Sequence, residues 1–220
     1  MSMKKIFAAL IMCITASVAS AQVFLDYATI EDIVKNERQY FDDIVDIYRN
    51  DDPMIRIDDI ALVYYGQAFL PQYNPGKDEN EKALKKYHDE GNHAKAYDTA
   101  IKIMEYNPAS LNALFNLLIS SKALGKSEEE FRSYAKKYQS ILNMITQYGD
   151  GKSCNSPFRV ITPDDQNYVL FHELEIEREI SRELDTETLC NIIIVEPTEK
   201  FQARRVYFDL SLFLKHTDSK

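Results

Sequence analysis

The chain has 220 residues, 45% of them hydrophobic, and its formal charge at pH 7 is −9. A chain of this length can bury a proper core, as one domain or as two small ones. Because an acidic protein is repelled by phosphate backbones, we do not expect a nucleic acid as the partner.

The first 21 residues have the pattern of a secretory signal peptide. A lysine pair is followed by the apolar run 6–14 and by the small residues Ala19-Ser20-Ala21. The apolar run is too short to span a bilayer as a helix. We therefore expect cleavage before Gln22, a mature chain with a formal charge of −11 once the two lysines are lost, and no transmembrane anchor. The predicted location is periplasmic or secreted.

Two helices and a loop are predicted after this segment. A single apolar stripe with helical period extends from Ile30 to Tyr48 and predicts one continuous helix. A second helix is expected to begin near Asp58 and to include Ala68. Two prolines and a glycine exclude a helix from Leu70 to Gly76, which is predicted to be a loop.

From residue 77 to residue 145 the helical pattern resembles the tetratricopeptide repeat. Counting 34 residues from Lys77 puts residues of the expected kinds at the family's spacings: Leu84, Tyr87, Gly91, Ala96 and Pro108. A second, degenerate unit begins at Leu111 and leads into a further helix that starts at Ser127. Such repeats need about three units to bury their own faces, so other parts of the chain should cover these two.

After a glycine-containing break the apolar period changes to that of strands. Strands are predicted at Phe158–Ile161, Tyr168–Ile180, Leu189–Val195 and Val206–Leu214. Consecutive strands separated by turns favour an antiparallel sheet with one apolar face on the helices. The predicted fold class is therefore α+β, with a helical part at 22–147 and a sheet part at 153–216 that form one compact unit.

Three cysteines are present, and Cys13 would leave with the signal peptide. A lipoprotein would need a small residue before that cysteine, and Met12 occupies the position. Cys154 and Cys190 remain, an even number for an oxidising compartment. A disulfide between them would close a loop of about 37 residues and contribute roughly 3–4 kcal/mol. Two separate buried thiols are the alternative.

Several short motifs resemble a family of exported proteins of unknown function that is common in Bacteroidetes-type bacteria. They are Tyr64-Tyr65-Gly66, Tyr73-Asn74-Pro75, Asn107-Pro108, Gly149-Asp150-Gly151, Thr162-Pro163-Asp164 and Val206-Tyr207-Phe208-Asp209. The likeness extends over most of residues 25–214. It implies one compact unit in the cell envelope and implies no particular reaction.

The tetratricopeptide resemblance also implies a peptide-binding groove formed by the first helix of each unit. The groove positions are Asp78, Glu81, Lys85, His88, Asn112, Phe115, Asn116, Ile119 and Lys122. Among these we take Lys85, His88, Asn112, Asn116 and Ile119 as candidate partner-binding residues, together with Tyr65 and Tyr73 beside the proline-containing loop. The alternative is that the protein's own helices or sheet fill the groove.

Catalytic chemistry has weaker support in the sequence. His88 and His93 lack the spacing of a helical metal pair, and no metal site or cofactor is predicted. Four alternating acids, Glu173, Glu175, Glu177 and Glu179, would share one face of a regular strand near His172. Their spacing could suit the two carboxylates of a glycoside hydrolase, but a row of four like charges is more typical of a solvated strand face. We therefore expect a non-enzymatic protein- or peptide-binding module of the envelope, with an envelope hydrolase as the alternative and no catalytic residue assigned.

Overall fold

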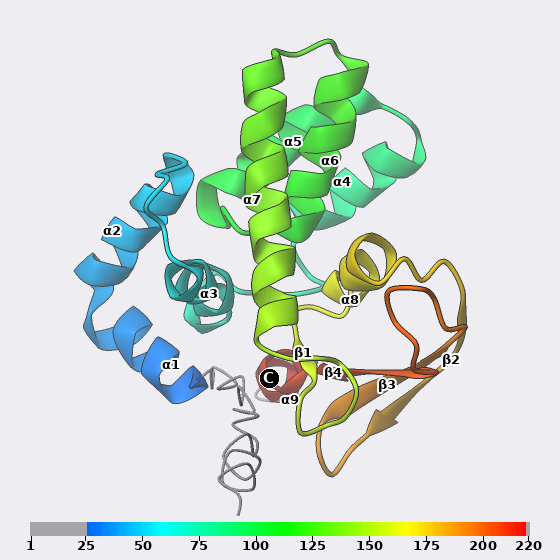
Figure 1. Ribbon diagram of the computed structural model, residues 1–220. Coiled ribbons are helices and arrows are strands. Elements are labelled where there is room, and N and C mark those ends of the chain that lie inside the picture. Colours follow the sequence, from blue (N-terminus) through cyan, green and yellow to red (C-terminus); the bar gives the residue numbers. More distant parts are fainter. Residues whose placement is uncertain (1–25, 219–220) are drawn as a thin grey trace, which may run out of the picture.

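The computed structural model describes residues 26–218, so the predicted signal peptide lies outside the described residues. A long helix, α7 (Glu128–Gln147), extends through the middle of the molecule (Figure 1). Helices α1 to α3 lie on one side of it, α4 to α6 lie around its first half, and a small sheet lies beyond its last turn. This arrangement confirms the α+β class. Among the described residues, no helix has both the length and the apolar character to cross a membrane.

The N-terminal helices differ from the prediction at one point. The stretch predicted as one helix forms α1 (Tyr27–Asn36) and α2 (Arg38–Arg49), because Glu37 between them has a non-helical backbone (φ −118°). The break lets both helices pack on α3 (Ile57–Gly66). A side chain at Gly66 would come within 2.5 Å of the Phe41 ring, so the backbone of α3 itself lies against α2. A short helical turn, η1 (Gln67–Phe69), then leads into the predicted loop.

Two helical hairpins follow, at the predicted positions. They consist of α4 (Glu79–Asp89) with α5 (His93–Tyr106), and α6 (Leu111–Ala123) with α7. The side chain of the residue before each helix accepts a hydrogen bond from its first turn, and these caps are Asp78, Asn92, Ser110 and Ser127. Gly91 and Gly125 both have φ +63°, the left-handed conformation that ends a helix and turns the chain.

The sheet is mixed, so the prediction of a purely antiparallel sheet is wrong. Its strands are β1 (Phe158–Arg159), β2 (Glu179–Asp185), β3 (Cys190–Val195) and β4 (Arg205–Asp209), in the order β1-β4-β3-β2. β4 and β2 are antiparallel to β3, whereas β1 is parallel to β4. A parallel pair needs a long connection, and here most of the C-terminal part of the chain separates β1 from β4.

Two predicted strands are partly helical. Residues 165–173 form α8 (Asp165–Tyr168) and the π-helical turn η2 (Val169–Glu173). This helix starts where Thr162 Oγ1 accepts from the Asp165 N–H and Asp165 accepts from the Thr162 N–H, a reciprocal pair typical of helix starts. The last predicted strand ends at Asp209, whose carboxylate accepts from the Ser211 N–H at the start of α9 (Ser211–Asp218).

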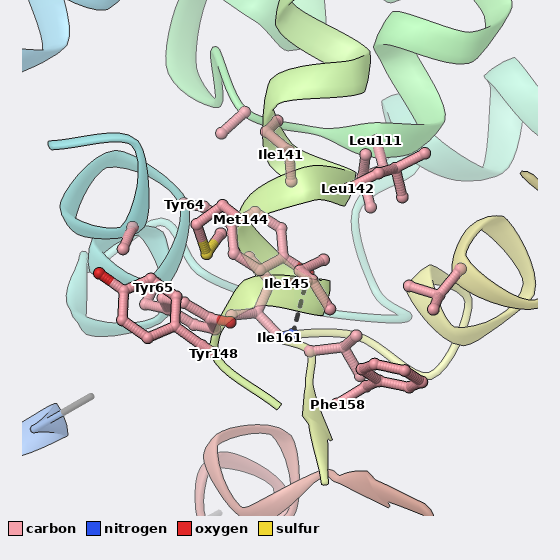
Figure 2. Close-up of a cluster of buried hydrophobic side chains, with 14 of the residues drawn as sticks. Tyr64, Tyr65, Leu111, Ile141, Leu142, Met144, Ile145, Tyr148, Phe158 and Ile161 are labelled. Atoms are coloured by element: carbon pink, nitrogen blue, oxygen red, sulfur yellow. Dashed lines mark hydrogen bonds between the residues drawn. The ribbon is translucent and has the colours of Figure 1, made fainter. Parts of the chain in front are cut away.

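One core joins the helical part to the sheet. Figure 2 shows its centre, where side chains of α3 and α7 meet β1 and the segment after it. Tyr64, Tyr65, Ile141, Ile145 and Phe158 are almost completely buried there. The dashed line in Figure 2 is the hydrogen bond from the Ile161 N–H to the Tyr64 hydroxyl, 3.3 Å long. A smaller cluster fills the interior of the two hairpins.

The structure contains a disulfide between Cys154 and Cys190, whose Cα atoms are 5.9 Å apart. It joins the loop after α7 to the first residue of β3. The loop is thereby held against the sheet.

Candidate functional site

A cavity of about 810 Å³ lies between the two hairpins and the C-terminal part. Its walls come from α4, from α6, from the loop between η1 and α4, and from residues 161–172. In Figure 1 this is the region where α8 faces α4 and α6. A volume of this order is typical of sites that hold a small molecule or a short segment of chain.

The cavity brings together most of the partner-binding residues that were predicted from the sequence. Five predicted partner-binding residues line it: Tyr73, Lys85, His88, Asn112 and Asn116. Three further groove positions, Asp78, Glu81 and Phe115, line it too, and so does His172 of the hydrolase alternative. The first helices of the two hairpins therefore face one shared space.

Other nominated residues lie elsewhere. Tyr65 is fully buried in the core, where its hydroxyl donates to the backbone oxygen of Arg159 (3.1 Å), so a partner cannot reach it. Ile119 and Lys122 lie on α6 outside the cavity lining. The four alternating glutamates do not share a strand face, because of the four only Glu179 belongs to a strand.

A chain of hydrogen bonds follows the wall between α4 and α6. Glu81 accepts from the Ser110 hydroxyl (3.0 Å) and from the amide of Asn112. Asn112 Oδ1 accepts in turn from Asn116 Nδ2 (2.9 Å), and Asn116 Oδ1 lies 2.9 Å from His88 Nδ1. The side chains are thus held in fixed orientations along the cavity. Burial, the largest cause, raises the pKa of Glu81 above its ordinary value.

Asp165 lies on the opposite wall and is only 5% exposed. Its Oδ2 accepts from the Tyr64 hydroxyl (2.8 Å) and from the Thr162 N–H (3.1 Å). Burial raises the pKa of Asp165 to about 7, the hydrogen bonds oppose this shift, and the charge of Glu81 adds to it. Two carboxyl groups that favour protonation therefore line one cavity and influence each other.

Aromatic rings cover another part of the wall. The Phe115 ring lies 5.4 Å from the Tyr168 ring and 5.3 Å from the His172 ring, centre to centre. The Tyr168 hydroxyl donates to Asn112 Oδ1 (3.1 Å), which fixes this ring against the polar wall. Partial burial lowers the pKa of His172. Phe171 also lines the cavity and is 52% exposed, an unusual position for a large apolar side chain.

Sequence reasoning missed Asp165, Tyr64, Tyr168 and Phe171 as site residues. A signal for the first was present, because Thr162-Pro163-Asp164-Asp165 has the composition of a helix start. That signal would have placed residues 165–172 on a helix. It would not have revealed that Tyr64, 101 positions earlier, donates to Asp165. No group of three or more potential metal ligands occurs among residues 26–218.

The fold is that of an α+β protein in which helical hairpins and a small mixed sheet share one core, with a ligand-sized cavity between the hairpins and the segment 161–172. The chain belongs to the family described as Domain of unknown function (DUF4919), whose profile matches residues 28–219. Neither a curated protein nor a solved structure matches the sequence. The resemblance to a family of unknown function is therefore confirmed, while the exported, Bacteroidetes-type character of that family and the tetratricopeptide likeness stay predictions.

Proposed function

We propose that this protein is a non-enzymatic binding module that takes a segment of a partner peptide into the cavity. The proposal rests on one observation: groove residues of α4 and α6, among them Lys85, His88 and Asn116, line the same cavity. The protein's own segment 161–172 forms a wall of this space and leaves about 810 Å³ open.

The polar groups of the lining suit a peptide. Amide side chains carry both a donor and an acceptor, which is what an extended backbone requires of its partner. The cavity is lined by many of them: Gln67, Gln72, Asn74, Asn107, Asn112, Asn116 and Asn167. The aromatic wall around Phe115 adds apolar surface for side chains of the peptide.

We further propose that the protein acts in the cell envelope, as a periplasmic or secreted protein. The signal-peptide pattern of residues 1–21 supports this location, and the disulfide between Cys154 and Cys190 suits an oxidising compartment. Sequencing the N-terminus of the protein purified from its native envelope tests the proposal. We expect the mature chain to begin at Gln22, and an intact Met1 in a reduced cytoplasmic fraction would contradict it.

Site-directed photocrosslinking tests peptide binding. A photoreactive amino acid placed at Phe171, on the exposed part of the cavity wall, should form a covalent adduct with a defined peptide segment of a partner. The same amino acid at Leu124, an exposed position between α6 and α7, is the matched control. Adducts that form equally at both positions, or at neither, would contradict binding in the cavity.

A hydrolase is a second candidate, because two titratable side chains converge in one pocket. Asp165 and Glu81 have raised pKa values and could act as a general acid and base beside His172. The test is hydrolysis of nitrophenyl glycosides and esters by wild type and Asp165→Asn. Turnover that is lost in the variant while the fold is retained would favour the enzyme over the binding module.

A further inference from the structure

The charges that line the cavity are unbalanced. Five carboxylates line it, Asp78, Glu81, Asp89, Asp164 and Asp165, against two lysines, Lys82 and Lys85. Lys82 pairs with Glu79 on its own helix (2.8 Å). Of the ion pairs formed between described residues, none includes any of the five carboxylates. With all five carboxyl groups ionised, the lining would carry three more negative than positive formal charges, which favours a positively charged ligand.

The two deepest carboxylates are held by neutral groups. Glu81 is bonded by the Ser110 hydroxyl and the Asn112 amide, and Asp165 by the Tyr64 hydroxyl and the Thr162 N–H. Such donors fix the position of a carboxyl group but supply no opposite charge. A cation that enters the cavity would find both acceptors already oriented, so little ordering would be needed for an ion pair.

The aromatic wall of the cavity could hold the apolar part of a cationic ligand. Phe115 and Tyr168, with ring centres 5.4 Å apart, present apolar surface in the same cavity as the carboxylates. A long side chain with a methylene stem and a charged end can bury the stem on such rings and keep its charge on acidic groups. Lysine and arginine are the side chains with this character.

We propose that the cavity binds a lysine or arginine side chain of the partner peptide, with its stem on Phe115 and Tyr168 and its charged end at Glu81 and Asp165. The inference rests on the proposed function and names the chemistry of its ligand. Charge complementarity selects this occupant, because an acidic or neutral peptide would leave the five carboxylates unpaired.

Binding should depend on pH through the two carboxyl groups. Tyr64 and Glu81 act on the pKa of Asp165. The charge of Asp165 in turn adds to the raised pKa values of the neighbouring tyrosines Tyr64, Tyr65, Tyr73, Tyr138 and Tyr168. Burial raises the pKa of each of these tyrosines, so they stay neutral between pH 6 and pH 8. Affinity for a cation should rise over that interval as Asp165, with a pKa of about 7, loses its proton. His88 and His172 also line the cavity. The part of the pH dependence that belongs to Asp165 is the part that is lost in Asp165→Asn.

Peptide pools provide the test. Acetylated and amidated pentapeptide pools with a fixed central lysine, arginine, norleucine or glutamate are passed over the immobilised full-length protein at pH 8, and bound peptides are quantified by mass spectrometry. We expect the lysine and arginine pools to be retained at least about tenfold more than the norleucine pool, as one buried charge contact allows. In Glu81→Gln and Asp165→Asn this ratio should fall below about threefold.

The control variant is Glu128→Gln, which removes an exposed carboxylate on α7 and should leave the ratio unchanged. Circular dichroism checks that each variant is folded, and Glu81→Gln alone decides the question if Asp165→Asn does not fold. Equal retention of the lysine and norleucine pools would overturn the cationic ligand and leave peptide binding intact. Retention of no pool would overturn both proposals.

Discussion

Two carboxylates in this molecule have opposite kinds of partner, one a cation and the other only neutral hydrogen-bond donors. Asp51, in the turn between α2 and α3, forms an ion pair with Lys137 of α7, and the Ser133 hydroxyl also donates to it. The Lys137 side chain is 8% exposed and the Asp51 side chain is 31% exposed, so the lysine end of the pair is shielded from water. Asp165 is buried at the cavity without a cation, held by a tyrosine hydroxyl and a backbone N–H.

The difference indicates separate roles for the two groups. A buried charge that only joins two elements is stabilised best by an opposite charge, and the Asp51 pair joins the α2–α3 turn to α7 in this way. A carboxylate left without its counter-charge costs stability, which suits a site where a ligand supplies the cation. The predictions below test this distinction.

The largest effect is expected at the paired site. Lys137→Met should lower the free energy of unfolding by about 3 to 5 kcal/mol, because it leaves Asp51 without its cation. Urea unfolding followed by circular dichroism measures the loss. Lys136→Met is the control, since that exposed lysine donates only to the Asp51 backbone oxygen, and it should cost less than about 1 kcal/mol. Equal losses in the two variants would show that the ion pair does not carry the stability.

Removing the disulfide should separate stability from binding. The double variant Cys154→Ser, Cys190→Ala should lose about 3 to 4 kcal/mol, because the two positions, 36 apart in the sequence, no longer close a loop in the unfolded chain. Neither cysteine lines the cavity, so retention of the lysine pool should stay unchanged under conditions where the variant is folded. A variant that lost binding of the lysine pool but kept its stability would contradict the expectation that the disulfide contributes to stability alone.

Asp165→Asn should increase stability in a pH-dependent way. The pKa of this carboxyl is about 7 in the folded protein and near 3.8 when unfolded, so the folded state holds the extra proton between these values. Wild-type stability should therefore fall as pH rises from 4 to 7, and the variant should lack this slope. A difference of about three pKa units corresponds to about 4 kcal/mol, so we expect the variant to be more stable than wild type by an amount of this order at pH 8 and equal to it at pH 4.

Asparagine suits this comparison because one acceptor oxygen can still receive both the Tyr64 hydroxyl and the Thr162 N–H. Unfolding in urea at the two pH values provides the measurement. Parallel pH profiles for variant and wild type would show that Asp165 is not the uncompensated group.

The smallest effect on stability is expected at Phe171. Phe171→Ala removes a half-exposed ring from the cavity wall and should change the free energy of unfolding by less than about 0.5 kcal/mol. Retention of the lysine pool should nevertheless fall about threefold. Leu124→Ala, at an exposed apolar position away from the cavity, is the control and should change neither quantity. A large loss of stability would mean that Phe171 belongs to the core.

The helical hairpins were predictable from sequence because each has local signals. An apolar stripe with helical period is bounded by capping residues such as Ser110 and Ser127, and glycines such as Gly91 and Gly125 mark the turns. These signals depend on residues a few positions apart. They were sufficient to put groove residues of α4 and α6 on neighbouring helices.

The C-terminal part was predicted less well because its decisive contacts are long-range. The apolar alternation between Tyr168 and Leu174 fits a strand as well as a helix, and β1 is parallel to β4 only because of the tertiary fold. The second wall of the cavity could not be found for the same reason. Asp165 becomes buried only when distant segments of the chain pack around it, and this burial raises its pKa, with a further rise from the charge of Glu81. The Tyr64 hydroxyl, 101 positions away in the sequence, opposes the rise through its hydrogen bond.

The most direct test of the account is an NMR titration of the Asp165 carboxyl carbon in the uniformly ¹³C-labelled protein, with the resonance assigned by its loss in Asp165→Asn. The account predicts a midpoint near pH 7 in the free protein. It also predicts a lower midpoint when the retained lysine peptide is added, because a cation favours the ionised form. Either of two results would contradict the claim that Asp165 is buried without a counter-charge and binds the positive charge of the ligand. One is a midpoint at the ordinary aspartate value in the free protein, and the other is an unchanged midpoint when that peptide is added.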